Sequence, residues 1–167
     1  PGTQLTFKRT VNGNSSMTSW RVVADTTFEG QRVHRLESDG DFELYDAGTH
    51  GWAASFRNGK LKRVVPHNGQ LPAALEVGRQ WRSEYLYTRR DGSQAKQERQ
   101  WRVAAREEVS VPAGAFDTFR IVSKGPALTL TLWYAPAIDF FVRRTTEGMV
   151  QVERVLMDYT PAKDRLK

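Results

Sequence analysis

Apolar residues occupy every second position in many short stretches of this chain, and polar residues stand between them. The alternating sets are Leu5 and Phe7; Trp20, Val22 and Ala24; Trp52, Ala54 and Phe56; Trp81, Tyr85 and Tyr87; Trp101, Val103 and Ala105; and Leu128, Leu130 and Leu132. Side chains two apart on a strand share one face of a sheet, so a period of two gives each strand one apolar face. The pattern therefore predicts a chain of half-buried β-strands.

Tight turns are predicted between these strands. The turn dipeptides are Asn12-Gly13, Glu29-Gly30, Asp39-Gly40, Asn58-Gly59, Asp91-Gly92 and Glu147-Gly148. Glycine adopts the positive φ that hairpin turns need, and Asn or Asp before it is favoured in type I′ turns. Short strands with a turn about every 8–12 residues are typical of an antiparallel all-β domain. Only residues 71–77 could form a single helical turn, so we expect very little helix.

The second half of the chain resembles the first. Ser19–Ala24 reads SWRVVA, and Gln100–Ala105 reads QWRVAA. We therefore expect one all-β domain of antiparallel meanders in two similar halves. The expected segments are halves 1–65 and 79–160 and a linker 66–78, within a single domain 1–167. Because one meander alone would expose an apolar face, the halves should close on each other as a curved sandwich or open half-barrel.

Composition excludes several classes of site. The chain has 167 residues, of which 39% are hydrophobic, which is enough for one domain with its own core. It has no cysteine, so disulfides, thiolate metal sites and a cysteine nucleophile are excluded. No apolar run reaches the ~18 residues of a membrane-spanning helix, so no transmembrane segment is expected. A signal peptide or lipid anchor is expected to lie outside this sequence.

The chain is basic, with a net charge of +6 and a pI near 9.8. Such a charge favours anionic partners. Basic and acidic residues alternate, however, as in Lys96–Arg99, and opposite charges on neighbouring strands pair across a sheet. We therefore interpret most charges as solvated faces. A nucleic-acid or anionic-polymer binding module is retained as an alternative function, although nucleic acid is not favoured as a partner.

The residues that could carry catalysis or bind a metal are few. None of His34, His50 and His67 has a metal-ligand spacing, so we expect no metal and no cofactor. His50 and His67 fall in predicted loops, and a hydrolase or lyase that uses one of them is a second alternative function. A general base would need a partner at hydrogen-bond distance, and the sequence identifies none, so no catalytic residue is predicted.

Three carboxylates alternate along one predicted hairpin. Asp39, Asp41 and Glu43 would lie on the same side of a turn and strand. The segment lacks the ligand spacing of a calcium-binding loop. We therefore interpret it as the solvated face of a hairpin.

Aromatic residues provide the candidate ligand site. The chain has 18 aromatic residues, most of which the core of a β-sheet domain requires. One group of aromatic residues stands beside two arginines. This candidate ligand-binding set is Trp133, Tyr134, Phe140, Phe141, Arg143 and Arg144. Together these side chains could line an apolar pocket with a cationic rim, which would suit an amphiphile with an anionic head.

Three segments of the second half carry a resemblance to a known family. They are Pro72–Trp81, which reads PAALEVGRQW; Val109–Phe119, which reads VSVPAGAFDTF; and Trp133–Pro136, which is followed by Val142–Arg144. These segments resemble the group catalogued as DUF3108, bacterial extracytoplasmic β-rich proteins of unknown function. The resemblance implies a periplasmic or outer-membrane-associated location and a sheet curved around a groove. The sequence departs from the pattern at Ala137–Asp139, where a glycine-containing turn is usual.

These observations lead to an expected function. We expect a non-enzymatic exported protein of the cell envelope. On its curved β-sheet it would bind a hydrophobic or amphiphilic small molecule, such as a lipid-like ligand, or a protein partner of the envelope.

Overall fold

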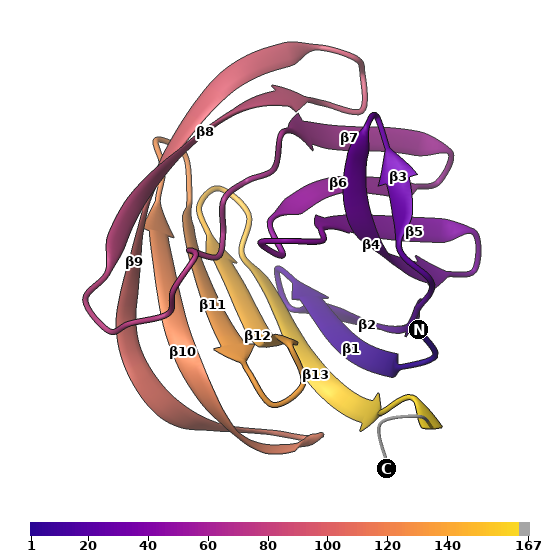
Figure 1. Cartoon of the computed structure of the whole chain (residues 1–167), viewed down its shortest axis with the longest axis vertical. Helices are drawn as coiled ribbons and strands as arrows, with labels where there is room; N and C mark the ends of the chain where they lie inside the picture. The colour runs from indigo at the N-terminus through magenta and orange to yellow at the C-terminus, as the bar shows by residue number, and fades with distance from the viewer. Residues whose placement is uncertain (164–167) are drawn as a thin grey trace.

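The computed structural model describes residues 1–163, which form an antiparallel sheet with almost no helix (Figure 1). The strands are β1 (Gln4–Val11), β2 (Asn14–Val22), β3 (Thr26–Phe28), β4 (Gln31–Ser38), β5 (Asp41–Asp46), β6 (Trp52–Arg57), β7 (Lys60–Val65), β8 (Gln80–Thr88), β9 (Gln94–Val111), β10 (Gly114–Lys124), β11 (Thr129–Ala135), β12 (Phe140–Glu147) and β13 (Val152–Thr160). The all-β prediction is confirmed. Within residues 1–163 there is no helix long and apolar enough to cross a membrane.

The sheet closes into a barrel of 12 strands. From β4 to β13, each strand pairs with its neighbours in sequence, and β1 pairs with both β2 and β13. Closure occurs between β2 and β4, where Arg21 faces Glu37 and Val22 faces Leu36. The short β3 pairs with β4 further along the same edge. The predicted sandwich or open half-barrel is therefore too open, because the pattern of apolar residues within each strand does not specify which distant strands become neighbours.

Four of the predicted turns have the backbone that their sequences require. Asn12-Gly13, Glu29-Gly30, Asp39-Gly40 and Asn58-Gly59 all have positive φ at both residues. This is the requirement of type I′ turns, whose twist matches that of the strands they join. Each turn joins two paired strands in a fixed register. The joined pairs are β1 with β2, β3 with β4, β4 with β5, and β6 with β7.

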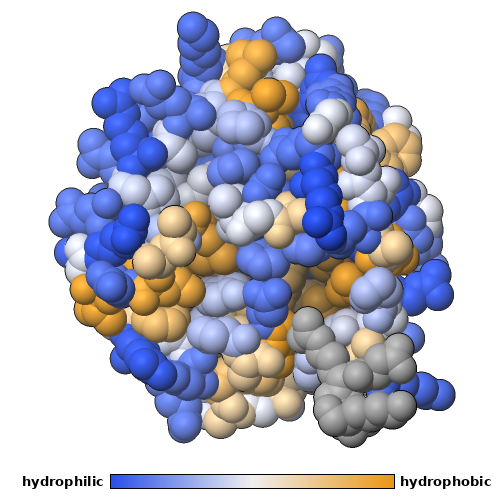
Figure 2. Space-filling view, in the orientation of Figure 1, coloured by the Kyte–Doolittle hydropathy of each residue, from blue (hydrophilic) through white to orange (hydrophobic). Residues whose placement is uncertain are grey.

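Most of the predicted alternating residues form the core. Leu5, Phe7 and Trp20 pack in one buried cluster, and Trp101 and Leu132 pack in another. The polar surface of the molecule, with apolar patches between charged groups, is visible in Figure 2. Packing inside the barrel therefore follows the period of two that the sequence displays.

The segment expected to link the two halves contains no strand. Residues 66–79 run from β7 to β8 and cross the view of Figure 1 in front of the sheet. The two proposed halves share one sheet, because β1 pairs with β13. The internal repeat itself stays a prediction.

Hydrogen bonds hold this connecting segment against the barrel. The buried Asn68 accepts a hydrogen bond from the backbone N–H of Trp52 and donates one to Gln70, whose amide in turn donates to the carbonyl of His50. The indole of Trp81 donates to the carbonyl of Gly69 at 2.7 Å. Because buried polar groups are costly unless they are paired, this network fixes the segment that carries Asn68 into the barrel.

Substitution of Gly69 by alanine is expected to destabilise the protein. Gly69 has a φ of +69°, and a Cβ there would lie 2.5 Å from the Cβ of Ser83. Left-handed strain and this clash should together cost about 2 kcal/mol, which lowers the Tm by about 4–8 °C in a chain of this size. Gly13→Ala is the control, because Gly13 has a φ of +84° and open space around it. Equal losses in the two variants, measured by thermal unfolding, would contradict the close approach at Gly69.

Candidate functional site

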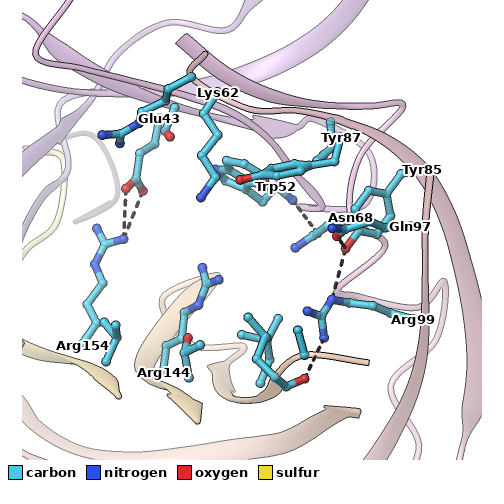
Figure 3. Close-up of a pocket in the computed structure, with 18 of the residues that line it drawn as sticks. Glu43, Trp52, Lys62, Asn68, Tyr85, Tyr87, Gln97, Arg99, Arg144 and Arg154 are labelled. Atoms are coloured by element: carbon cyan, nitrogen blue, oxygen red, sulfur yellow. Dashed lines mark hydrogen bonds and ion pairs between the residues drawn. The ribbon is translucent and has the colours of Figure 1, made fainter. Parts of the chain in front are cut away.

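A cavity of about 450 Å³ lies inside the barrel, and its lining is unusually cationic (Figure 3). The basic residues that line it are Arg9, Arg57, Lys62, Arg90, Arg99, Arg144 and Arg154. The acidic ones are Glu43 and Glu98. Much of the net positive charge of the molecule therefore faces this cavity, and is not only distributed over solvated faces as the sequence suggested.

Strand periodicity places these polar groups inside. Lys62 and Val64 both line the cavity from β7, and Arg144 and Thr146 both line it from β12. Arg144 lies opposite Arg154 in the register of β12 and β13. Since residues two apart point to the same side of a strand, a basic residue at an inward position must project into the barrel.

Glu43 neutralises two of these arginines. The residue is 4% exposed, and its carboxylate accepts hydrogen bonds from Arg57 at 2.5 Å, from Arg154 at 3.1 Å and from the hydroxyl of Tyr45 at 2.8 Å. Arg57 comes from β6 and Arg154 from β13. The interpretation of Glu43 as part of a solvated hairpin face is therefore wrong, because β5 turns this residue into the barrel.

The pKa of Glu43 reflects this surrounding. Burial alone would raise the pKa, but the positive charges of Arg154 and Arg57 and the hydrogen bond from Tyr45 outweigh it and lower the pKa to about 2. The carboxylate is thus ionised at any physiological pH. Among residues 1–163, Nη2 of Arg154 is buried and has no hydrogen-bond partner.

Other cations of the cavity have no carboxylate at ion-pair distance among the described residues, and three of them are at least partly buried. Arg99 is 8% exposed and donates to neutral groups, the hydroxyls of Tyr85 at 3.1 Å and Ser123 at 3.4 Å and the carbonyl of Leu128 at 3.5 Å. Burial lowers the pKa of Arg144. These charges are only weakly compensated by the protein itself.

Lys62 is the third such cation. Burial, reinforced by the positive charge of Arg144 and other cavity arginines, lowers its pKa to about 8. Its ammonium group lies 5.4 Å from the ring centroid of Trp52 and 5.5 Å from that of Tyr87. Figure 3 displays Lys62 beside these two rings, which form an aromatic wall of the cavity. Apolar residues complete the lining, among them Leu128 and Leu130.

Of the six residues predicted to bind a ligand, only Arg144 lines this cavity. Tyr134, Phe140 and Phe141 are packed in the core clusters. The indole of Trp133 donates a hydrogen bond to Glu107 at 2.9 Å. The guanidinium carbon of Arg143 lies 4.9 Å from the ring centroid of Trp133. Arg143 in turn pairs with Glu153 at 2.7 Å. Four of the six, Phe140, Phe141, Arg143 and Arg144, share only a small void of about 10 Å³. The ligand-binding role of this set stays a prediction.

The histidines lie outside the cavity lining. Nε2 of His50 is 3.1 Å from Oδ1 of Asp139, and the ring of His50 stacks on that of His34 with centroids 5.1 Å apart. His34 also contacts Asp25 at 2.6 Å. Within residues 1–163 no group of three or more metal-ligating side chains comes together. His50 therefore has the carboxylate partner that a general base needs, but at a place that the cavity does not reach.

Comparison with known proteins identifies the fold. No family model and no curated protein matches the chain, so the resemblance to DUF3108 is not shown by them. Among solved structures, the hypothetical lipoprotein YmcC from Escherichia coli is similar over 96% of this chain and 86% of its own, with a TM-score of 0.57 and 15% identity. A candidate lipoprotein from Parabacteroides distasonis is similar over 96% of this chain and 95% of its own, with a TM-score of 0.47 and 15% identity. The likeness to YmcC establishes the fold alone.

Glu43→Gln is expected to remove a large acid-sensitive part of the stability. The folded pKa of about 2 lies below the ordinary value of 4.5, so the ionised carboxylate stabilises the fold above pH 4.5, and this contribution is lost as the pH falls from 4.5 to 2. Loss of the charge also leaves Arg57 and Arg154 unpaired, and we expect a cost of about 3 kcal/mol at pH 7.

Urea unfolding at pH 7 and at pH 3 would measure this effect. The wild type should lose more stability than Glu43→Gln between these two pH values. Glu98→Gln serves as a matched control, because Glu98 also lines the cavity but its pair with Arg82 is exposed, with a side-chain exposure of 44% for Glu98; it should cost less than about 1 kcal/mol. Parallel pH profiles for the wild type and Glu43→Gln would contradict the assignment.

Lys62→Met is expected to stabilise the protein at neutral pH. A lysine whose folded pKa is about 8 binds its proton less tightly in the folded state than in the unfolded state, so its charge opposes folding below pH 8, and stability rises between pH 8 and 10.5. A gain of about 1 kcal/mol would raise the Tm by about 2–4 °C at pH 7, with a smaller gain at pH 10. Lys60→Met, at the exposed start of the same strand, should change little. A lower Tm for Lys62→Met at pH 7 would mean that the contacts with Trp52 and Tyr87 outweigh burial.

Proposed function

We propose that this chain is a non-enzymatic, extracytoplasmic binding protein that holds an amphiphile with an anionic head inside its barrel. The observation that carries the proposal is that weakly compensated cations and an aromatic wall line the same cavity. Lys62, Arg99 and Arg144 supply the charge, and Trp52 and Tyr87 supply the wall.

The charges support an anionic ligand. A buried cation without a counter-charge is costly, and proteins normally pair it. Arg99 is buried and its hydrogen-bond partners are neutral. An anion in the cavity would supply the missing counter-charge. The cations therefore fit a binding role better than a role in holding the fold together.

The rest of the lining supports an apolar body on that ligand. Leu128, Leu130 and Val152 line the cavity together with the aromatic wall. A volume of about 450 Å³ is in the range of small-molecule pockets, which combine apolar walls with a few well-placed polar groups. A ligand with both a charged head and an apolar chain would use both parts of this surface.

The position of the cavity favours a small ligand over a polymer. The barrel is closed around it, and the connecting segment carries Asn68 into its lining. Nucleic acid or another anionic polymer would need an open groove with exposed aromatic residues. Trp52 and Tyr87 instead stand inside, so the polymer alternative has no comparable support. Binding to a protein partner of the envelope stays a prediction.

A binding role is also supported over catalysis by the place of the histidines. His50 and Asp139 form a pair away from the cavity lining, and neither His34 nor His67 belongs to that lining. The extracytoplasmic location is supported by the resemblance of the second half to DUF3108. It agrees with the description of YmcC as a hypothetical lipoprotein.

Blocking the cavity should abolish binding. Ala127 is exposed and lines the cavity between β10 and β11, so Ala127→Trp would obstruct it without changing the core. We expect Ala127→Trp to weaken binding of decanoate and of decyl phosphate at least tenfold, as measured by isothermal titration calorimetry. Ala73→Trp is the control, because Ala73 is exposed on the connecting segment and does not line the cavity. Failure of the wild type to bind either compound would overturn the proposed function.

A further inference from the structure

We propose that the ligand head is a doubly charged oxyanion of the phosphomonoester type, and that Lys62, Arg99 and Arg144 hold it. This inference rests on the proposed function for the apolar body of the ligand. It adds the class of the head group and the residues that recognise it.

The ion pairs inside the barrel single out these three cations. Arg57 and Arg154 are engaged by Glu43 at 2.5 and 3.1 Å. Arg9 and Arg90 line the cavity but are exposed, so water already solvates their charges. The remaining basic residues of the lining are at least partly buried and have no carboxylate partner among the described residues; they are Lys62, Arg99 and Arg144.

These three side chains come from separate parts of the wall. Lys62 extends from β7, Arg99 from β9 and Arg144 from β12. In Figure 3 they point toward one shared space from different sides. Donors that converge from several sides suit a tetrahedral oxyanion with three free oxygens, whereas a planar carboxylate offers two oxygens in one plane.

The present hydrogen bonds of Arg99 leave it able to serve a ligand. Its Nη1 contacts Ser123 at 3.4 Å and the carbonyl of Leu128 at 3.5 Å, both longer than the usual 2.9–3.0 Å. Its Nε–H bond to Tyr85, at 3.1 Å, fixes the plane of the guanidinium. A phosphoryl oxygen could therefore replace two weak contacts by a charge-assisted one while the Tyr85 bond keeps its orientation.

The amount of charge favours a dianion. A carboxylate would compensate one of the three cations, and a phosphomonoester, which is doubly charged near neutral pH, would compensate two. Above pH 8, Lys62 must take up a proton when such a group binds, since burial and neighbouring arginines lower its pKa in the empty cavity to about 8. Affinity should accordingly fall as the pH rises through 8.

Calorimetry with matched ligands tests the inference. The probes are decyl phosphate, methyl decyl phosphate as a monoanionic diester, decanol as a neutral analogue, and inorganic phosphate, all at pH 7.5. We expect decyl phosphate to bind at least tenfold more tightly than the diester. Arg144→Gln and Lys62→Met should each weaken decyl phosphate binding at least tenfold. Arg106→Gln is the control for loss of one arginine, because Arg106 is exposed and paired with Asp117 on the outside; it should leave affinity within twofold.

The pH dependence provides an independent readout. Wild-type affinity for decyl phosphate should fall about tenfold between pH 7.5 and 9.5, and this fall should be absent in Lys62→Met. Because Lys62→Met is expected to be more stable than the wild type, the test holds even if Arg144→Gln does not fold. An unchanged affinity across this pH range in the wild type would count against a role for Lys62.

The outcomes separate this inference from the proposed function. Equal binding of decyl phosphate, the diester and decanol, unaffected by Arg144→Gln, would overturn the phosphomonoester site but leave an amphiphile-binding barrel. Binding of inorganic phosphate that depends on Arg144, with no contribution from the decyl chain, would support the dianion site and overturn the amphiphile. Binding of none of the four probes would overturn both.

Discussion

The buried ion pairs of Glu43 are the interaction on which the interior of this barrel depends. A closed sheet removes many inward side chains from bulk water, so a buried charge that points inward needs a partner. Glu43 on β5 supplies that partner to Arg57 on the adjacent β6 and to Arg154 on β13, near the other end of the chain. One carboxylate thus links β13 to β5 and β6 inside the barrel as well as neutralising two charges.

The same arrangement explains why the cavity retains positive charge. Glu43 is fully engaged, and the other acidic residue of the lining, Glu98, is exposed and paired with Arg82. Little negative charge is left for Arg99 and Arg144. A barrel whose only task was to be stable could have apolar residues at these inward positions, since such replacements of buried charges are often neutral or stabilising. Retention of cations beside Trp52 is therefore consistent with binding.

The local structure was predictable from the sequence, and its closure was not. The alternation at Leu5 and Phe7 and the turn at Asn12-Gly13 depend on neighbours in the chain, so a single sequence carries their signal. The contact between β2 and β4 instead depends on the summed twist and bulges of all the strands that lie between them in the sheet. No short motif encodes that sum, which is why the sequence alone predicts an open sheet.

The candidate site was predictable only at Arg144. The aromatic residues near it in sequence, such as Phe141, are packed in the core, whereas the aromatic residues of the cavity, such as Trp52 and Tyr87, are distant in sequence. The sequence carries little signal for Glu43 and Lys62, because Glu43 alternates with the apolar Phe42 and Leu44, and Lys62 shares its strand face with Lys60. A solvated hairpin face is the natural interpretation of such residues until the partner strands are known.

The junction between β2 and β4 has a mechanical consequence. It consists of two residue pairs, whereas β9 and β10 are paired along the whole length of β10. A ladder with fewer hydrogen bonds takes less free energy to separate, so this seam is weaker than the ladder between β9 and β10. Neither β2 nor β4 contributes a residue to the cavity lining, so a local separation of the seam would not remove any side chain from the site.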